Sequence, residues 1–543
     1  MALTRREFLT RTGSAGGLSA AFLMMQSLGL MPAKAALASA ISADPKTGKG
    51  IRVAILGAGV AGLVAAYELG RLGYECTLLE SRERPGGRLW TARNGTKITL
   101  NGYGTQTCSF DEGNYQNLGP GRIPSIHGTM LGYLRELGVE MEVEINTTRS
   151  SLLQDDKVNG GKAVLQRQAI NDARGEVAEL LAKCISQGAL DQTMTKEDRD
   201  RILTFLRTFG PLDSTRKYVG SERAGYSAQP GAGDQTGVLS KPLDLHTLLD
   251  ESFWEGMFFE ETFDMQSTMF QCKGGNDRIA YAFAKKLGDV ILYNAPVKEI
   301  RKFAKGVRVV YIQDGVEKSL DADYCFCALP LSILKKVPND FSAEHKKVIE
   351  DSTYASAYKV AWESRRFWEQ DYNLYGGLSF LAQGCSPIWY PSANLFAERG
   401  VLVSGYQYHE IGTSFGSMTL EQKFAESRAA IERVHPGHGK ELEKPLYIGW
   451  GYEPNNLGSW VRTYGKTTET NKSNYETLIT PDGPIYFIGD HASHVVAWME
   501  GAALSAHRAI GLLNERVSSA RVSAAIPTAA HTKTIASTGI TRL

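Results

Sequence analysis

An α/β fold built around a Rossmann-like dinucleotide-binding unit is predicted by a buried strand, a glycine-rich turn and a second strand that ends on an acid. Residues 51–56 are apolar and rich in β-branched side chains, which suits a strand buried on both faces of a parallel sheet. The turn Gly57-Ala58-Gly59-Val60-Ala61-Gly62 follows this strand and opens a helix expected over 63–72. A second strand over 75–79 ends on Glu80, about 20 residues past the glycines, which is the spacing of dinucleotide-binding proteins.

Each position of this turn has a predicted role. Gly57 permits the tight turn, Gly59 lets the backbone approach a pyrophosphate, and Gly62 lets the helix pack closely on the strand. The phosphates are expected at the amides that begin the helix, with Ala61 among the residues that contact the cofactor. Glu80 is expected to accept the ribose hydroxyls, and an acid there argues against NADP. The alternative for Glu80 is an exposed carboxylate at a strand end.

Length and composition describe an ordinary globular protein of two or three domains. A chain of 543 residues is too long for one hydrophobic core. With 43% hydrophobic residues, 22% charged residues and a net charge of +1, it has no strong field that would attract nucleic acid. A homodimer is one assembly that we consider, although no sequence pattern specifies it.

The first forty residues resemble an export signal rather than part of the fold. Thr4-Arg5-Arg6-Glu7-Phe8-Leu9 precedes a weakly apolar run over 15–31 and small residues at 33–35. This order is typical of a twin-arginine signal with a small-x-small cleavage site. The alternative is an anchor helix, but glycine and polar residues inside the run make it a poor membrane span. We therefore expect 1–40 to be a targeting segment, with no stable membrane anchor, on a periplasmic or secreted protein.

The cysteines predict neither a disulfide framework nor a metal site. There are seven of them, they are scattered, and their neighbours are largely apolar, so we expect buried free thiols. Cys325-x-Cys327 alternates as in a strand and lacks the two-residue gap of a redox or zinc pair.

A glycine doublet stands directly after the acid proposed to bind ribose, in Arg84-x-Gly86-Gly87-Arg88. Adjacent glycines expose consecutive amides to an anion, and Arg88 can add a charged fork to the pyrophosphate. A plain Gly-Gly turn with exposed arginines would explain the doublet but not its position. In this placement the chain resembles the flavoprotein amine oxidase superfamily, whose doublet holds FAD phosphates. The resemblance also assigns Arg82 to the cofactor.

The segment Gly119-Pro120-Gly121-Arg122-Ile123-Pro124 resembles the Gly-x-x-Arg-(Ile/Leu)-Pro loop of L-amino acid oxidases, whose arginine binds the substrate carboxylate. A planar guanidinium on a loop shaped by glycine and proline is suited to grip a carboxylate in two places. From the residues alone, a structural arginine paired with a nearby acid is the favoured alternative. The resemblance reverses that preference and places Gly121 and Arg122 near the flavin as well. Gly121 stands where relatives often carry methionine.

Residues 270–329 resemble a return to the nucleotide domain. Gly274-Gly275 precedes a helix expected over 279–287 and a strand over 290–293, and the resemblance places the backbone of Val297 against the adenine. The segments 307–313 and 319–329 alternate as strands, which we expect in a small antiparallel layer.

Two further site residues come from alternating segments. Lys359 lies in the apolar stretch 355–362, where a lysine must reach solvent or make a specific contact. In amine oxidases a lysine followed by Phe-Trp at a similar distance holds a water against flavin N5, and the resemblance assigns this role to Lys359. The alternative is that Lys359 lies on an edge strand and blocks association with other strands. The strand over 401–408 resembles the L-amino acid oxidase segment that carries a tyrosine to the substrate carboxylate. We choose Tyr406 over Tyr408 for that role.

The end of the fold resembles the closing FAD motif of the superfamily. A strand over 485–488 leads into Gly489-Asp490, and a helix of small residues follows Trp498-Met499. The resemblance places Gly489 and Asp490 at the ribityl and phosphate region and the helix start near Met499 at the flavin O2 edge. It makes Trp498 one wall of an aromatic cage over the substrate face of the flavin.

The sequence therefore predicts a discontinuous Rossmann-like FAD-binding domain with two additions. Its parts are 50–130, 265–340 and 481–516, with a helical insertion over 131–264, a mixed α+β substrate-binding domain over 341–480 and a disordered tail over 517–543. The resemblance, which covers roughly 50–515, implies oxidation of L-amino acids by O2 to 2-oxo acids, ammonia and hydrogen peroxide. The resemblance assigns catalytic roles to Lys359 and Trp498, and it assigns substrate binding to Arg122, Tyr406 and Trp498.

Several alternatives to this activity stay open. They are an oxidase of amines without a carboxylate, a monooxygenase that gives an amide, and an exported flavin-binding protein without catalysis. We expect non-covalent FAD, because 449–454 and 458–460 lack the cysteine through which monoamine oxidases bind it.

Overall fold

The computed structural model describes residues 44–188 and 194–525. The predicted twin-arginine segment therefore lies outside the described residues, as do 526–543 at the end of the predicted tail. Within the described ranges, no helix combines the length and the apolar character needed to cross a membrane.

A five-stranded parallel sheet forms the centre of the dinucleotide-binding part, in the order β14-β2-β1-β18-β26. Its strands are β1 (Arg52–Leu56), β2 (Glu75–Leu79), β14 (Ile291–Leu292), β18 (Tyr324–Cys327) and β26 (Ile485–Phe487). Helix α3 (Val60–Arg71) crosses from β1 to β2, and α9 (Arg278–Leu287) packs beside it. Strands from the beginning, middle and end of the chain thus meet in one sheet, which confirms the predicted α/β class with a Rossmann-like arrangement.

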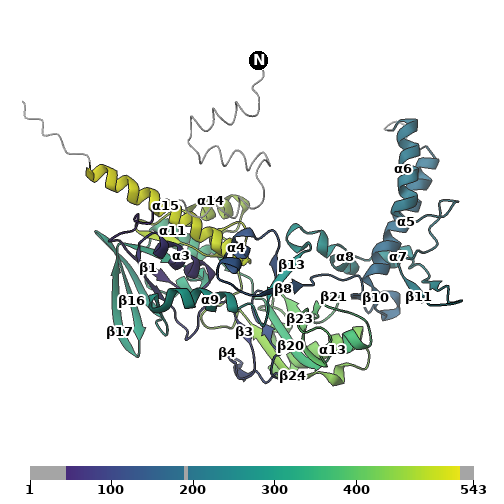
Figure 1. The fold of residues 1–543 in the computed structure, drawn as a ribbon, viewed down its shortest axis with the longest axis horizontal. Coiled ribbons are helices and arrows are strands. Elements are labelled where there is room, and N and C mark those ends of the chain that lie inside the picture. Colours follow the sequence, from purple (N-terminus) through teal and green to yellow (C-terminus); the bar gives the residue numbers. More distant parts are fainter. Residues whose placement is uncertain (1–43, 189–193, 526–543) are drawn as a thin grey trace, which may run out of the picture.

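The strand expected over 319–329 is two strands in different sheets. Strands β15 (Val297–Phe303), β16 (Gly306–Gln313) and β17 (Val316–Ala322) form the antiparallel layer, which projects from the body in Figure 1. Strand β18 instead lies between β1 and β26 in the parallel sheet. The prediction of one antiparallel strand is wrong here because Cys325, Phe326 and Cys327 are fully buried on both faces, as in an interior parallel strand.

A seven-stranded sheet carries the second part of the molecule, in the order β10-β9-β21-β22-β23-β20-β24. Its strands are β9 (Leu152–Gln154), β10 (Val164–Leu165), β20 (Tyr358–Arg365), β21 (Leu378–Leu381), β22 (Ile388–Trp389), β23 (Arg399–Gln407) and β24 (Glu443–Gly449). Helix α13 (Leu420–Val434), which begins with a Thr419/Gln422 capping box, packs on this sheet. Strand β20 is paired on both sides, so the edge-strand alternative for Lys359 is wrong.

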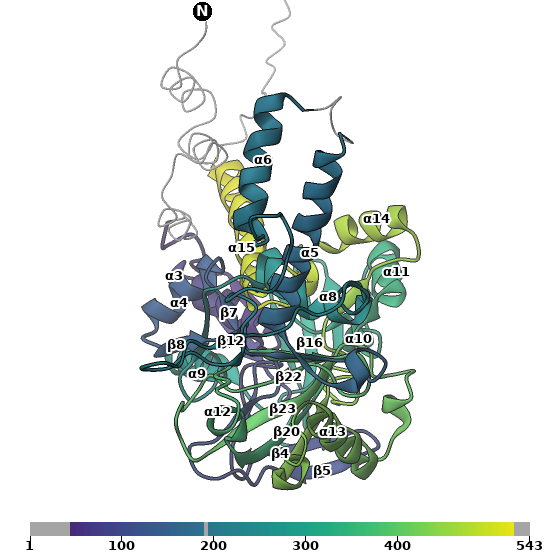
Figure 2. The ribbon, with the colours of Figure 1, turned by 90° about the vertical axis from the view of Figure 1, so that its right-hand side faces the viewer.

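The helical insertion projects from the body. Figures 1 and 2 show α5 (Gln166–Ser186) and α6 (Lys196–Phe209) as a pair that extends outward, while α7 (Leu245–Leu248) and α8 (Glu251–Phe258) lie nearer its base. Helix α6 begins with a Thr195/Asp198 capping box. Short strands β11 (Tyr226–Ala228) and β12 (Val238–Leu239) pair within the same region.

The last described helix is longer than expected and packs against the first helix of the dinucleotide-binding part. Helix α15 (Met499–Ala525) packs on α3, and Val517 is buried in the same core, so the prediction of a disordered tail from 517 is wrong as far as Ala525. Both carboxylate oxygens of Glu500 accept hydrogen bonds from the first turn of α4 (Gly128–Glu136), from Thr129 N at 2.9 Å and Met130 N at 2.8 Å. This acidic cap satisfies amides that α4 leaves unpaired.

The remaining elements are short. They are β3 (Thr91–Ala92), β4 (Lys97–Leu100), β5 (Gly104–Thr107), β6 (Gln116–Asn117), β7 (Ile123–Pro124), β8 (Met141–Glu144), β13 (Met269–Cys272), α10 (Leu331–Leu334), α11 (Ala343–Asp351), β19 (Thr353–Tyr354), α12 (Phe367–Gln370), β25 (Val461–Thr463) and α14 (Thr468–Leu478). The cysteines are free thiols, but Cys184 is exposed and Cys76 is half-buried, so the expectation of complete burial is wrong for these two.

Candidate functional site

The main cavity begins at the carboxyl end of β1 and reaches β20 and β23. It holds about 1280 Å³ of space between atoms, part of it open to solvent. Most of the residues predicted to hold the dinucleotide line it, namely Gly57, Gly59, Ala61, Glu80, Arg82, Gly86, Gly87, Arg88, Val297, Gly489, Asp490 and Met499. The predicted active-site residues Lys359, Tyr406 and Trp498 line it too. Segments that are hundreds of residues apart therefore share one site.

The glycine turn has the shape expected of a phosphate cradle. Gly57 has a φ of +96°, a conformation that suits glycine, and a Cβ added at Gly59 would meet nothing within 4 Å. A Cβ at Gly62 would lie 2.0 Å from the carbonyl oxygen of Gly57, which agrees with the predicted close packing of helix on strand. No side chain caps the first turn of α3, so its amides are free to face an anion. Gly86 N donates to Ala58 O at 2.7 Å and holds the doublet against this turn.

Glu80 is buried at the end of β2 and is held by its neighbours. Its carboxylate accepts from Ala58 N at 2.8 Å and from Arg82 N at 2.9 Å. An ionised carboxylate has further acceptor capacity, which leaves room for ribose hydroxyls. The alternative of an exposed strand-end carboxylate is wrong, because Glu80 is only 2% exposed. The amides, the acid and the open space at Gly59 together fit a dinucleotide.

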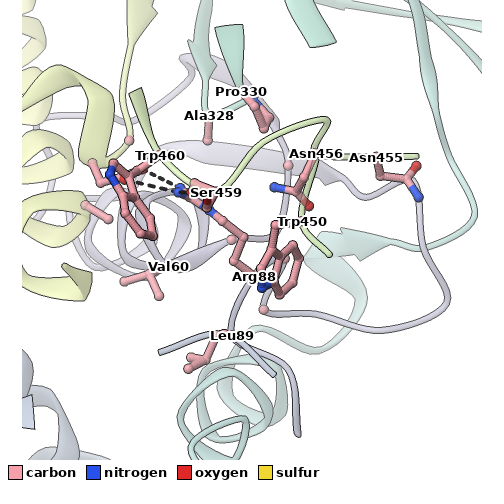
Figure 3. A pocket seen from close by; sticks show the side chains of 18 of the residues that line it. Val60, Arg88, Leu89, Ala328, Pro330, Trp450, Asn455, Asn456, Ser459 and Trp460 are labelled. Carbon is pink, nitrogen blue, oxygen red and sulfur yellow. Dashed lines mark hydrogen bonds and ion pairs between the residues drawn. The ribbon is translucent and has the colours of Figure 1, made fainter. Parts of the chain in front are cut away.

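Arg88 joins the first and last parts of the cavity. Its guanidinium contacts the carboxylate of Asp490 and the carbonyl of Ser459, and one Nη1–Oδ2 distance is 3.1 Å. Figure 3 shows Arg88 between the loop that carries Ser459 and the ring of Trp450. Burial raises the pKa of Asp490, but the charge and hydrogen bonds of Arg88 lower it below its ordinary value. The fork predicted to reach the pyrophosphate is thus directed at Asp490, and the pyrophosphate contact stays a prediction.

Lys359 is a buried ammonium held by the backbone of the 117–121 loop. It is 3% exposed, and its Nζ donates to Asn117 O at 2.8 Å and Gly119 O at 2.6 Å. Burial is the larger cause and the charge of Arg122 the smaller one of a lowered pKa of Lys359, which is about 7. The side chain can therefore gain or lose a proton near neutral pH. Its Cα faces Tyr406 across the sheet, and Nζ lies 5.1 Å from the centre of that ring.

Aromatic residues form much of the remaining wall. Tyr406 lines the cavity. Tyr408 does not line it; its ring packs edge-on against the ring of Tyr406, with 5.2 Å between the ring centres. Trp498 lies edge-on to His127 at 4.9 Å. Trp450 and Trp460 line the cavity as well. The sequence does not predict this, because no pattern in their segment marks a cavity wall.

Arg122 and Gly121 differ from the prediction, because neither lines the main cavity. The guanidinium of Arg122 is 5% exposed, lies 4.5 Å from the ring centre of Trp389 and 5.6 Å from that of Phe259, and donates to Asn146. A Cβ on Gly121 would lie 2.3 Å from Trp389, so this indole occupies the space of a side chain at 121. Among the described residues, no acidic side chain lies within 4 Å of the Arg122 guanidinium, although the buried carboxyl of Glu144 is close enough for its pKa to be lowered by the charge of Arg122. The structural alternative weighed from the sequence therefore stays open.

Trp389 and Glu144 complete the surroundings of Arg122. Trp389 Nε1 donates to Glu144 Oε1 at 3.0 Å, and the other oxygen of this carboxyl has no hydrogen-bond partner among the described residues. Burial raises the pKa of Glu144 to about 7, although the charge of Arg122 opposes this. Neither residue can be predicted from the sequence, because they belong to no motif and meet only through the tertiary fold.

Comparison with known proteins agrees with this site. The sequence model described as "Flavin containing amine oxidoreductase" matches residues 60–510. A flavin-dependent L-tryptophan oxidase of Lentzea aerocolonigenes is 27% identical, over 84% of this chain and 98% of its own. An L-amino-acid oxidase of Pseudechis australis is 25% identical, over 87% of this chain and 89% of its own.

Solved structures share the fold. Putrescine oxidase bound to putrescine superposes with a TM-score of 0.55 at 20% identity, covering 85% of this chain and 99% of its own. Cyclohexylamine oxidase from Brevibacterium oxydans IH-35A gives a TM-score of 0.57 at 16% identity, covering 86% and 99%. Since the family match extends over most of the chain, the protein belongs to the flavin-containing amine oxidoreductases.

Proposed function

We propose that this protein is an FAD-dependent L-amino acid oxidase. In balanced form, an L-amino acid, O2 and water would give a 2-oxo acid, ammonia and hydrogen peroxide. The observation that carries the proposal is Arg122, a buried cation with no acidic side chain within 4 Å among the described residues and with Glu144, whose pKa burial raises to about 7, as a nearby carboxyl. A buried charge is costly unless it is paired, and a substrate carboxylate would pair it. The names of the L-tryptophan and L-amino-acid oxidase relatives support the same substrate class.

Some residues of the main cavity would bind the cofactor, and others would bind the substrate. The chemistry supplied by bound FAD is two-electron oxidation of the substrate C–N bond, with the electrons passed on to O2. The amides of α3 and the doublet would hold the phosphates, and Glu80 would hold the ribose. Attachment would be non-covalent, since no cysteine among the described residues lines the cavity.

The substrate carboxylate would bind between Arg122 and Tyr406, with Trp498 as a wall of the amine pocket. Because Trp389 and Phe259 cover Arg122, one of these rings must shift for a carboxylate to reach it. Protonated Lys359 would hold a water and deliver a proton to the oxygen-reducing step, since its Nζ has a donor beyond the two used by backbone carbonyls.

Removal of Arg122 should lower kcat/KM for amino acids but not for simple amines. In Arg122→Ala, kcat/KM for L-amino acids is expected to fall roughly 30- to 160-fold, the equivalent of ~2–3 kcal/mol for a lost charge-assisted hydrogen-bond pair. Hydrogen peroxide production is measured with L-tryptophan and tryptamine, and with L-phenylalanine and phenethylamine. D-enantiomers are the stereochemical control.

The matched control is Arg308→Ala, which removes an exposed arginine that pairs with Asp321 and does not line the main cavity. Flavin content and melting temperature establish that each variant is folded. Equal turnover of amino acid and decarboxylated amine, or an unchanged kcat/KM in Arg122→Ala, would favour an amine oxidase instead. Amide formed without peroxide would indicate a monooxygenase, and a flavin that no substrate reduces would indicate a binding protein.

Lys359→Met should slow reaction of the reduced enzyme with O2 by roughly 10²-fold or more, the range of a positioned acid, while flavin reduction changes little. The protonated form is the one that assists, so in the wild type the rate with O2 should fall as pH rises through about 7, the pKa of Lys359. The variant should lack this decline. Stopped-flow absorbance measures both half-reactions, and equal slowing of the two would remove the assigned role.

We also propose export by the twin-arginine route to the periplasm or beyond. This proposal rests on the segment Thr4-Arg5-Arg6-Glu7-Phe8-Leu9 and the small residues at 33–35. Assembly as a homodimer stays a prediction.

A further inference from the structure

A second cavity meets the main cavity at Lys359. It holds about 550 Å³ of space between atoms, and Lys359 is the one residue of the described chain that lines both cavities. The amide side chains of Gln116, Asn117 and Gln271 form part of its wall, together with the loop 391–394. Because Asn394 is exposed, this loop brings the second cavity to the protein surface.

The partition between the cavities is thin and polar. Asn117 lines the second cavity, Gly119 lines the main one, and the carbonyls of both accept hydrogen bonds from Lys359 Nζ. An ammonium has three donors, so one is left after these two bonds. Water reaching the inner end of the second cavity would find that donor and the neighbouring amide groups, and a buried water needs such polar partners.

The proposed oxidase needs a route for protons that does not pass through the main cavity. Oxidation of the amino acid releases two electrons and two protons, and O2 takes up two of each to form hydrogen peroxide. During turnover the cofactor and substrate fill the main cavity. Lys359, whose pKa burial and Arg122 lower to about 7, can pass protons near neutral pH only if solvent reaches it.

We propose that the second cavity is a solvent passage that brings water and protons to Lys359 while the main cavity is filled. This inference rests on the proposed function, since it gives Lys359 its supply of protons. The amide side chains in the wall offer hydrogen-bond partners to water, beside apolar lining residues that include Val401 and Val403. The passage opens beside Asn394 and ends at the partition formed by Asn117, Gly119 and Lys359.

Chemical labelling of Lys359 tests the passage without any measurement of activity. FAD-loaded protein is treated with trace acetic anhydride, which acetylates neutral amines, and the modified fraction at each lysine is measured by mass spectrometry. FAD fills only part of the main cavity, so the test compares variants: reagent that arrives through the main cavity would label Lys359 equally in the wild type and in a variant that blocks the second cavity. Ala393→Trp, which places an indole in the second cavity, is expected to slow acetylation of Lys359 at least 10-fold, while the exposed Lys318 is unchanged.

The matched control is Ala397→Trp, which adds the same bulk to the same loop at a position that does not line the cavity. It should leave labelling of Lys359 at the wild-type rate. If Lys359 is not labelled in loaded wild-type protein, or is labelled equally fast in Ala393→Trp, the passage does not exist. Flavin content and melting temperature show whether Ala393→Trp folds, and Asn114→Trp, at another residue that lines the same cavity, is a second variant.

Reoxidation of photoreduced enzyme gives an independent readout, because it needs no amino acid. Ala393→Trp is expected to slow reaction with O2 several-fold at pH 8, where Lys359 must be reprotonated, and to leave reduction by L-amino acids unchanged. Slower reoxidation with unchanged labelling would show that Ala393→Trp acts on the reaction with O2 by another route than water supply to Lys359 and would overturn the proposal. A flavin that no amino acid reduces would refute the proposed function while the labelling result still stands.

Discussion

Gly62→Ala is expected to abolish stable flavin binding, whereas Gly70→Ala in the same helix should retain it. A Cβ on Gly62 would lie 2.0 Å from the carbonyl oxygen of Gly57, and a backbone atom cannot move aside cheaply. Overpacking of this kind costs ~1–3 kcal/mol, and here it displaces the start of α3 from β1, together with the amides proposed to hold the phosphates. A Cβ on Gly70 meets nothing within 4 Å and should stabilise the helix by about 0.5–1 kcal/mol.

Gly59→Ala is expected to weaken FAD binding without changing the stability of the cofactor-free protein. Its Cβ would also meet nothing within 4 Å, so the cofactor-free protein should melt as the wild type does. That Cβ would nevertheless stand where a pyrophosphate has to approach the backbone, and affinity for FAD should fall roughly 100-fold, or ~2.7 kcal/mol. The measurements are the ratio of flavin to protein absorbance after gel filtration and the FAD Kd by fluorescence quenching. Full flavin content in Gly62→Ala would contradict the assigned roles.

Lys423→Met is expected to destabilise the protein by ~3–5 kcal/mol, because it leaves a buried carboxylate without its cation. Lys423 and Glu410 are both fully buried, with Nζ and Oε1 2.9 Å apart. Lys423 also donates to Phe415 O, and Glu410 accepts from the hydroxyl of Tyr447, so the pair closes a network beneath the seven-stranded sheet. Burial raises the pKa of Glu410. Protonation of this carboxyl would therefore reduce the loss of stability in Lys423→Met without removing it.

Urea unfolding followed by circular dichroism measures this loss. The double variant Glu410→Gln with Lys423→Met should recover much of the stability, because it removes both charges together. Arg201→Ala is the control, since its pair with Glu197 is largely exposed and should contribute little. A Lys423→Met protein that unfolds at the wild-type urea concentration would show that the pair does not support the fold.

The sequence predicted the parts of the site that rest on local patterns. The turn at Gly57, Gly59 and Gly62 and the acid at Glu80 have roles that depend on backbone shape and short spacing, and all but Gly62 line the cavity. Gly62 packs against Gly57 as its spacing predicts. The roles of these residues toward FAD stay predictions until the variants are measured.

The surroundings of Arg122 could not be predicted, because they depend on contacts between distant segments. Trp389 has no motif, yet its ring covers the guanidinium and occupies the space beside Gly121. Lys359 could be recognised as an unusual lysine on an apolar strand, but its carbonyl partners at Asn117 and Gly119 come from 240 residues or more earlier in the chain. Alternation over 319–329 predicts one strand where the structure has β17 and β18 in different sheets, because alternation alone does not specify which sheet a strand joins.

The contact between Arg88 and Asp490 has a consequence for how the protein is made. These residues are 402 positions apart, and at about 5–20 residues per second a ribosome needs roughly 20–80 s to travel from one to the other. Glu500, which caps α4, and β26, which completes the parallel sheet, are synthesised later than nearly all of the fold. The dinucleotide site therefore cannot be completed before Asp490 and the segments that follow it have been synthesised, and stable binding of FAD should come after that point.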